Sequence, residues 1–146
     1  MATLPEILTE DSKKQSVIAD CVKLINEEVS DKSGLSGLAI KAGYSAVKGV
    51  KPGFVEGAVA DMLPEFAKAL DPMFQEAQGA GKSVSDFFTA NAGRVADALL
   101  SITDAKAARA KSGAAKGAYD KLRGTAKKNV ESAVPRLGKM IEKYAG

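Results

Sequence analysis

Several residue types that carry chemistry are absent from this sequence or scarce in it. Its 146 residues include no histidine, no tryptophan, one cysteine, three tyrosines and five phenylalanines. Without histidine the chain lacks the usual general base, the histidine-dependent catalytic triads and the commonest metal ligand. A single cysteine excludes an internal disulfide. These absences predict a protein that is not an enzyme, with no catalytic, cofactor-binding or metal-binding residues.

Long apolar runs are also missing. No stretch approaches the roughly 20 apolar residues that a membrane-spanning helix requires. The first residues, MATLPEILTEDSKK, lack the positive and then apolar pattern of a secretory signal. The expected location is therefore the cytoplasm, which the single cysteine also favours.

What the sequence has in abundance is small residues, namely 25 alanines and 14 glycines. Alanine is the best helix former and has little side chain to pack, so closely approaching helices are expected. No segment alternates between apolar and polar residues for long enough to indicate a strand. We predict that residues 1–146 form a single all-α domain, a compact bundle of about six to eight helices.

Capping patterns place the first helices. The segments Thr3–Glu6 and Ser12–Gln15 each match a capping box, a signature of a helix N-terminus. After the second box, apolar residues follow one arc at helical spacing, which predicts an amphipathic helix over about residues 12–30. Cys21 lies in the middle of that arc, so we expect a small core residue and not a reactive thiol.

Residues 35–50 are apolar around most of the helical circumference. A helix of this kind is typical of the middle of a bundle, so we predict that it is the central helix. Three glycines in this segment each cost roughly 1 kcal/mol relative to alanine in a helix interior. We expect close approach of neighbouring helices to compensate at Gly37, Gly43 and Gly49.

Prolines and glycines divide the remaining helical segments. Pro64 is compatible with either a kink or a new helix start, and Asp71-Pro72 resembles an N-cap followed by the first residue of a new short helix. Asn91 is a candidate internal break or N-cap. The C-terminal segment fits either one long helix interrupted at Gly124 and near Pro135, or two or three short helices in phase.

The segment Gly79–Ser83 resembles the end of a phosphate-binding loop. That motif needs a first glycine five residues before the second, where this sequence has Glu76, and it needs a preceding strand. Helix punctuation explains the segment better, with Gly79 ending one helix and Ser83 capping the next, with Asp86 at its third position.

Charge is distributed unevenly along the chain. Residues 1–105 carry a net charge of −5, whereas the basic C-terminal region, residues 106–146, carries +8. Such a cluster predicts either phosphate binding or a surface that attracts the acidic half of the same molecule. The candidate polyanion-binding residues are Arg109, Lys111, Lys116, Lys121, Arg123, Lys127 and Lys128.

Three stretches together are similar to a family of small bacterial helical proteins with no assigned activity. They are SGLSGLAIKAGYSAVKGVKPGFVEGAVADMLPEFAKALDP, FFTANAGRVADALLSITDAKAAR and KKNVESAVPRLGKMIEKY. The resemblance extends from about Asp31 onward and implies a bacterial intracellular protein, without functional residues to carry over.

The sequence therefore favours a non-enzymatic interaction or structural protein. Its partner would be another protein or a second copy of the chain, bound through faces rich in alanine and glycine. The alternative is a weak, sequence-independent binder of nucleic acid or another polyanion through residues 106–128.

Overall fold

The computed structural model describes residues 3–32, 34–49, 52–109 and 113–145, with the backbone alone for residues 35, 36, 115 and 118. These residues form seven helices and no strands, which confirms the predicted all-α bundle. The helices are α1 (Leu4–Leu8), α2 (Lys14–Asp31), α3 (Gly34–Lys48), α4 (Phe54–Gly79), α5 (Val84–Ala90), α6 (Ala92–Ala108) and α7 (Gly113–Ala145). None of these described helices is both long and apolar enough to cross a bilayer.

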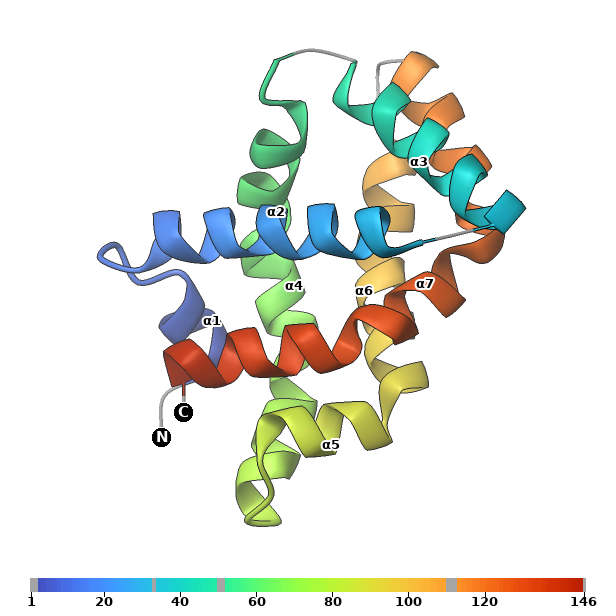
Figure 1. Cartoon of the computed structure of the whole chain (residues 1–146). Coiled ribbons are helices and arrows are strands. Elements are labelled where there is room, and N and C mark those ends of the chain that lie inside the picture. Colours follow the sequence, from blue (N-terminus) through green and yellow to red (C-terminus); the bar gives the residue numbers. More distant parts are fainter. Residues whose placement is uncertain (1–2, 33, 50–51, 110–112, 146) are drawn as a thin grey trace.

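Helix α4 occupies the middle of the bundle (Figure 1). It contacts α1, α2, α3, α5 and α6 and contributes eight buried residues to the core. Helix α7 bends between a first part beside α3 and a second part that runs alongside α2 (Figure 1). Helices α4 and α6 cross behind that pair, so α2 and the end of α7 form one layer over them.

The prediction of a central helix over residues 35–50 is wrong in its position. Helix α3 lies at the edge of the bundle and packs mainly on α7. Its outer face carries Leu38, which is 65% exposed, together with the exposed Ala39, Ala42 and Ala46. Alanine side chains present so little apolar area that a helix rich in them can face water at small cost.

One of the three glycines in α3 makes the expected close contact. A Cβ atom added to Gly43 would lie 2.6 Å from Cδ2 of Leu122 on α7. Gly37 is crowded by the backbone of Lys32, two residues before the helix, and Gly49 follows the last turn. The close approach between helices is therefore confirmed at Gly43.

The two N-terminal capping boxes differ in outcome. Thr3 caps α1 by accepting a hydrogen bond from the backbone N–H of Glu6, as predicted. At α2 the prediction is wrong. The helix begins at Lys14, its N-cap is Lys13, and no side chain forms a capping hydrogen bond there. Ser12 instead donates a hydrogen bond to the Glu10 carboxylate at 2.8 Å.

The predicted new helix at Asp71-Pro72 is also wrong, since α4 continues through Pro64 and Pro72. Both prolines are exposed, where water can solvate the carbonyl groups that they leave unbonded. Asp71 does cap a helix, but a different one. Its carboxylate accepts the backbone N–H of Leu4 at 2.8 Å and so fixes the start of α1 to the side of α4.

The segment that resembles a phosphate loop is helix punctuation, as predicted. Gly81 has a left-handed backbone with φ of 67°, and the N–H groups of Gly81 and Lys82 donate to carbonyls in the last turn of α4. This is the Schellman arrangement that ends helices. Ser83 then caps α5 by accepting from the N–H of Asp86.

In the second half of the chain, one predicted break separates two helices and the others lie inside a single helix. Asn91 separates α5 from α6, and its side chain donates to the carbonyl of Phe87. The C-terminal segment is one helix of 33 residues that includes Gly124 and Pro135. The core that all of these helices cover is apolar and contains no buried polar side chain among the described residues.

Candidate functional site

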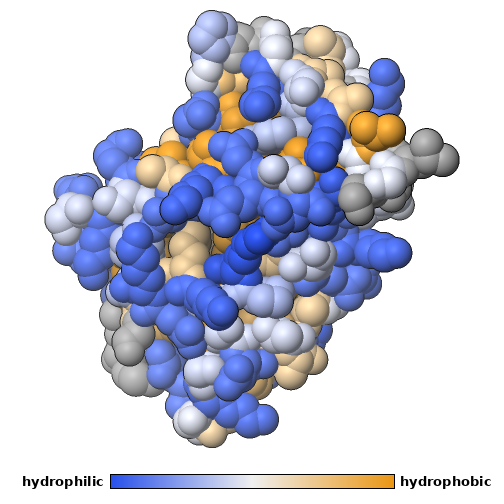
Figure 2. All heavy atoms as spheres, viewed as in Figure 1, coloured by the Kyte–Doolittle hydropathy of each residue, from blue (hydrophilic) through white to orange (hydrophobic). Residues whose placement is uncertain are grey.

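An apolar cleft runs between α2 and the second part of α7, with α4 and α6 beneath it. Its volume is about 300 Å³, and it is lined by 22 residues, of which 18 are apolar. Figure 2 shows apolar side chains between hydrophilic bands that overlie α2 and the end of α7. The core therefore opens to the surface along this seam.

Helical spacing explains why α7 lines the cleft with one face. Val130, Ala133, Leu137 and Met140 recur at intervals of three and four residues and all face it. Val134 and Gly138 lie on the neighbouring face and are buried against the rest of the bundle. One long helix thus carries two adjacent apolar faces with different partners.

The two ends of the cleft differ in the residue types that line them, although almost all of the surface exposed in the cleft is apolar. The end beside α1 is apolar and includes Leu8, Leu70 and Ile141. The four polar residues of the lining come from the last turn of α2 and the residue that follows it, from the second half of α6 and from the middle of α7. They are Glu28, Lys32, Thr103 and Asn129.

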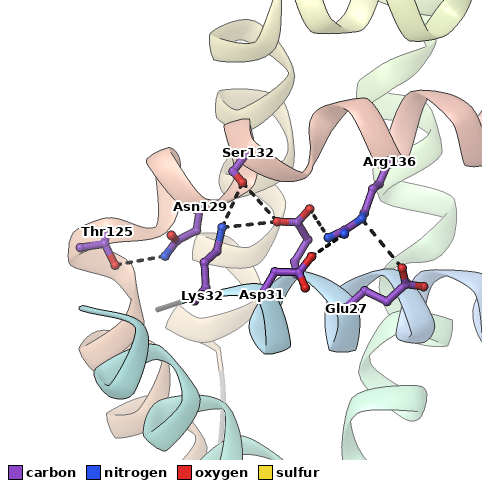
Figure 3. A network of polar contacts seen from close by, with 8 residues as sticks. Glu27, Asp31, Lys32, Thr125, Asn129, Ser132 and Arg136 are labelled. Carbon is purple, nitrogen blue, oxygen red and sulfur yellow. Dashed lines mark hydrogen bonds and ion pairs between the residues drawn. The ribbon is translucent and has the colours of Figure 1, made fainter. Parts of the chain in front are cut away.

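Ion pairs join α2 to α7 at this polar end (Figure 3). Arg136 of α7 donates to Glu28 at 2.8 Å and to Asp31 at 2.5 Å. Lys32 donates to Glu28 at 3.3 Å and to Ser132 at 3.0 Å, and Ser132 donates to Glu28 at 3.2 Å. The Glu28 side chain is 13% exposed and receives three donors, so its charge is well compensated.

A second polar bridge joins the same helices nearer to α1. Lys143 and Tyr144 donate to one oxygen of Asp20, at 2.8 and 2.5 Å. The hydrogen bonds from Lys143 and Tyr144 lower the pKa of Asp20 below its ordinary value. The two bridges hold α2 against α7 from both ends of the cleft.

Cys21 lies in the cleft lining between these bridges. Its Sγ is 3.8 Å from Sδ of Met140, and burial raises the pKa of the thiol to about 11. At neutral pH such a thiol stays protonated and is a poor nucleophile. The prediction of a packed cysteine is confirmed, although the space beside it is a cleft.

The candidate polyanion-binding residues do not share one environment. Arg123 forms an ion pair with Asp104 at 2.8 Å, and Lys127 forms one with Asp97 at 3.1 Å. Arg109, Lys116, Lys121 and Lys128 are exposed, and Lys111 lies outside the described residues. Part of the basic region thus neutralises acids of α6, while binding of a polyanion by the remainder stays a prediction.

The chain was also compared with known proteins. Residues 4–145 match DUF6918, which is described as a family of unknown function. The chain belongs to this family. A search of curated proteins and a search of solved structures found no match. Membership in DUF6918 confirms the predicted resemblance to a helical family without assigned activity, whereas a bacterial origin stays a prediction.

The sequence did not reveal the cleft of this DUF6918 chain. The apolar face of α7 is visible as residues at intervals of three and four, but the same spacing is typical of an ordinary core. The paired charges Glu28 and Arg136 are 108 positions apart, so no local pattern connects them.

Among the described residues, no group of three or more acidic or cysteine side chains is placed to hold a metal ion.

Proposed function

We propose that this protein is a non-enzymatic binding protein that holds a small apolar ligand in the α2–α7 cleft. The observation that carries the proposal is the cleft itself, about 300 Å³ in volume with 18 apolar residues among the 22 that line it. Ligand pockets in proteins begin at about this volume and are mostly apolar, with a few polar groups that orient the ligand.

The energetics of such a space support an occupant. The cleft opens to the surface, so its apolar lining is left in contact with water. Covering that lining removes apolar area from water, which is favourable by about 25 cal/mol for each Å². Water fills an apolar space poorly because it finds no hydrogen-bond partners there. An apolar molecule would restore the missing contacts.

A binding role agrees with the chemistry of the lining. Cys21, the cysteine of the lining, has a thiol pKa of about 11. The Glu28 carboxylate is occupied by hydrogen bonds from Arg136 and Lys32. Neither group is set up for proton transfer or nucleophilic attack at neutral pH.

Calorimetric titration of the purified protein with toluene tests the proposal. Toluene has no head group, so it reports the apolar space alone. We expect saturable binding with one site per chain and a rise in the thermal unfolding midpoint with toluene concentration, because the ligand binds the folded state. Absence of saturable binding would overturn the proposal.

Two substitutions of the same kind on α7 locate the site. Ala133→Phe places a ring in the cleft and should abolish toluene binding, whereas Ala114→Phe adds the same ring at an exposed position and should leave binding intact. Val130→Phe is a second filling variant if the first one folds poorly, as judged by circular dichroism. Equal binding by filled and control variants would place the ligand elsewhere.

Sedimentation of the same samples separates a small ligand from a protein occupant. If a second copy covers the cleft, the chain will dimerise and toluene will compete with dimerisation. That outcome would replace the small-ligand proposal with self-association. A monomer that binds toluene supports the proposal as stated.

A further inference from the structure

We propose that the outer side of α3 and of the first part of α7 docks on an anionic lipid surface. This docking surface is defined by one exposed leucine and four exposed lysines, namely Leu38, Lys41 and Lys48 of α3 and Lys121 and Lys128 of α7. None of these residues lines the α2–α7 cleft. The proposal therefore goes beyond the proposed function and does not depend on it.

One exposed face of α3 combines an apolar side chain with positive charge. Lys41 follows Leu38 by three residues and Lys48 follows Lys41 by seven, so the three side chains lie on one side of the helix. Among the described residues, Leu38 is the one large apolar side chain that faces water, with 65% of its surface exposed. Helix α3 contains no acidic residue. An apolar side chain thus lies among cations alone on this helix.

Helix α7 adds two cations on the same side of the molecule. Its first part lies beside α3 at the edge of the bundle (Figure 1). Leu122 packs on α3, whereas Arg123 and Lys127 form ion pairs with acids of α6. Because each residue turns a helix by about 100°, Lys121 and Lys128 lie on the other side of α7, away from α6. They extend the basic face of α3 across the α3–α7 pair.

The positive charge of the docking surface is largely uncompensated. Among the described residues, the ion pairs involve other cations. The Lys48 ammonium lies 5.0 Å from the centroid of the Tyr44 ring, a contact that does not neutralise its charge. Burial, and then the charge of Glu56, raises the pKa of Tyr44, so one acid lies nearby. Four lysines against this one carboxylate leave the surface positive.

The combination of charge and apolar exposure favours a lipid surface over other occupants. Each lysine close to an anionic bilayer raises the binding constant about fivefold. Nucleic acid phosphates also attract lysines, but they offer no apolar surroundings to Leu38. A second copy of the chain that docked through the same face would bring lysines against lysines. Mobile lipid head groups can match cations at any spacing, and the acyl boundary beneath them accepts Leu38.

Co-sedimentation of the whole chain with lipid vesicles tests the proposal. We expect binding to vesicles of phosphatidylglycerol and phosphatidylcholine in equal parts, and no binding to phosphatidylcholine alone. Binding should weaken steeply between about 0.1 and 1 M salt, because the Debye length falls from about 10 Å to about 3 Å. Absence of binding to the anionic vesicles at the lower salt concentration, or equal binding to both vesicle types, would overturn the proposal.

Two charge-matched double variants locate the surface. Lys41→Gln with Lys121→Gln removes one cation from each helix, so binding to the anionic vesicles should weaken about 25-fold, or fivefold for each lysine. Lys68→Gln with Lys82→Gln removes the same charge from exposed positions on α4 and just after it, and should leave the affinity nearly unchanged. Equal weakening by the two double variants would mean that net charge and not this surface governs binding, and would contradict the proposal.

Leu38→Gln separates lipid from other anions, because it removes the apolar side chain and leaves the charge unchanged. Binding to the anionic vesicles should weaken severalfold. Duplex DNA that binds more tightly than the vesicles, with an affinity that this variant does not change, would replace the lipid surface with nucleic acid. Toluene binding by the same variants should equal that of the parent chain, since the substituted residues lie outside the cleft lining. The cleft and the docking surface can therefore fail separately.

Discussion

Helix α7 packs against α5 and against α2 in different ways. At α5 the two backbones approach so closely that a Cβ atom on Gly138 would lie 2.6 Å from Cα of Ser85, and Phe88 is fully buried. At α2 the lining residues Leu24 and Ile25 are half-buried, and ion pairs at the ends of the cleft hold the helices together. The first contact excludes water by close packing, whereas the second leaves a space between apolar faces.

The contrast shows what each kind of contact contributes. Close packing gains dispersion energy and buries apolar area, so it stabilises the fold and leaves no room for a ligand. Exposed ion pairs contribute little stability but set the geometry of the two helices. Under the proposed function, a ligand would enter at the α2 contact while the closely packed α5 contact supports the fold.

The two contacts should differ most in the stability that is lost when a large side chain is truncated. Phe88→Ala should lower the free energy of unfolding by about 3–5 kcal/mol, because the fully buried ring leaves a cavity. Leu24→Ala should cost only about 1 kcal/mol, since that half-buried side chain already faces open space. Urea unfolding measures both values, and equal losses would contradict the comparison.

Addition of one methyl group tests the closeness of the α5 contact. Gly138→Ala forces Ser85 and its helix to move and should destabilise the protein by about 1–3 kcal/mol. Gly124→Ala, on the same helix with no neighbour within 4 Å of the added atom, should stabilise it by roughly 0.5–1 kcal/mol. Thermal unfolding of the two variants separates the steric effect from helix propensity. A Gly138→Ala variant more stable than the parent would contradict the close contact with α5.

A labelling rate reports how firmly the ion pairs hold α2. Cys21 is the single cysteine, and its reaction with a thiol reagent requires access to the cleft. Arg136→Gln removes the contacts with Glu28 and Asp31, so labelling at constant pH should become severalfold faster. Arg94→Gln breaks a comparable pair with Glu76 outside the cleft and should leave the rate unchanged. Equal rates in all three proteins would mean that the ion pairs do not hold the helix.

The smallest expected effect is the pH dependence of the second bridge. Lys143 and Tyr144 lower the pKa of Asp20 in the folded protein. This contact therefore stabilises the fold above the ordinary pKa of an aspartate, about 3.9, and the contribution is lost as the pH falls through the lower folded value. Asp20→Asn should be less stable than the parent at pH 7, with the difference shrinking below pH 4. A pH-independent difference between their urea midpoints would argue against the bridge.

Most local caps were predictable, although Ser12 bonds to Glu10 and does not cap α2. Thr3 caps the N–H of Glu6 and Ser83 caps that of Asp86, each three residues away, so both caps follow from the sequence. Asp71 has the residue type of a cap, but its partner Leu4 is 67 positions away. The sequence could not show that partner, and it placed a helix start where α4 continues.

The sequence by itself determined that this protein is helical, because alanine content, helical spacing and capping residues act over a few residues at a time. It also determined the composition of each helix face. Only the tertiary structure decided that α4 and not α3 is central, and that one face of α7 packs tightly on α5 while the next lines a cleft. The spacing of apolar residues indicates that a helix face avoids water. Whether a neighbouring helix or an open cleft covers that face depends on distances between segments far apart in the chain.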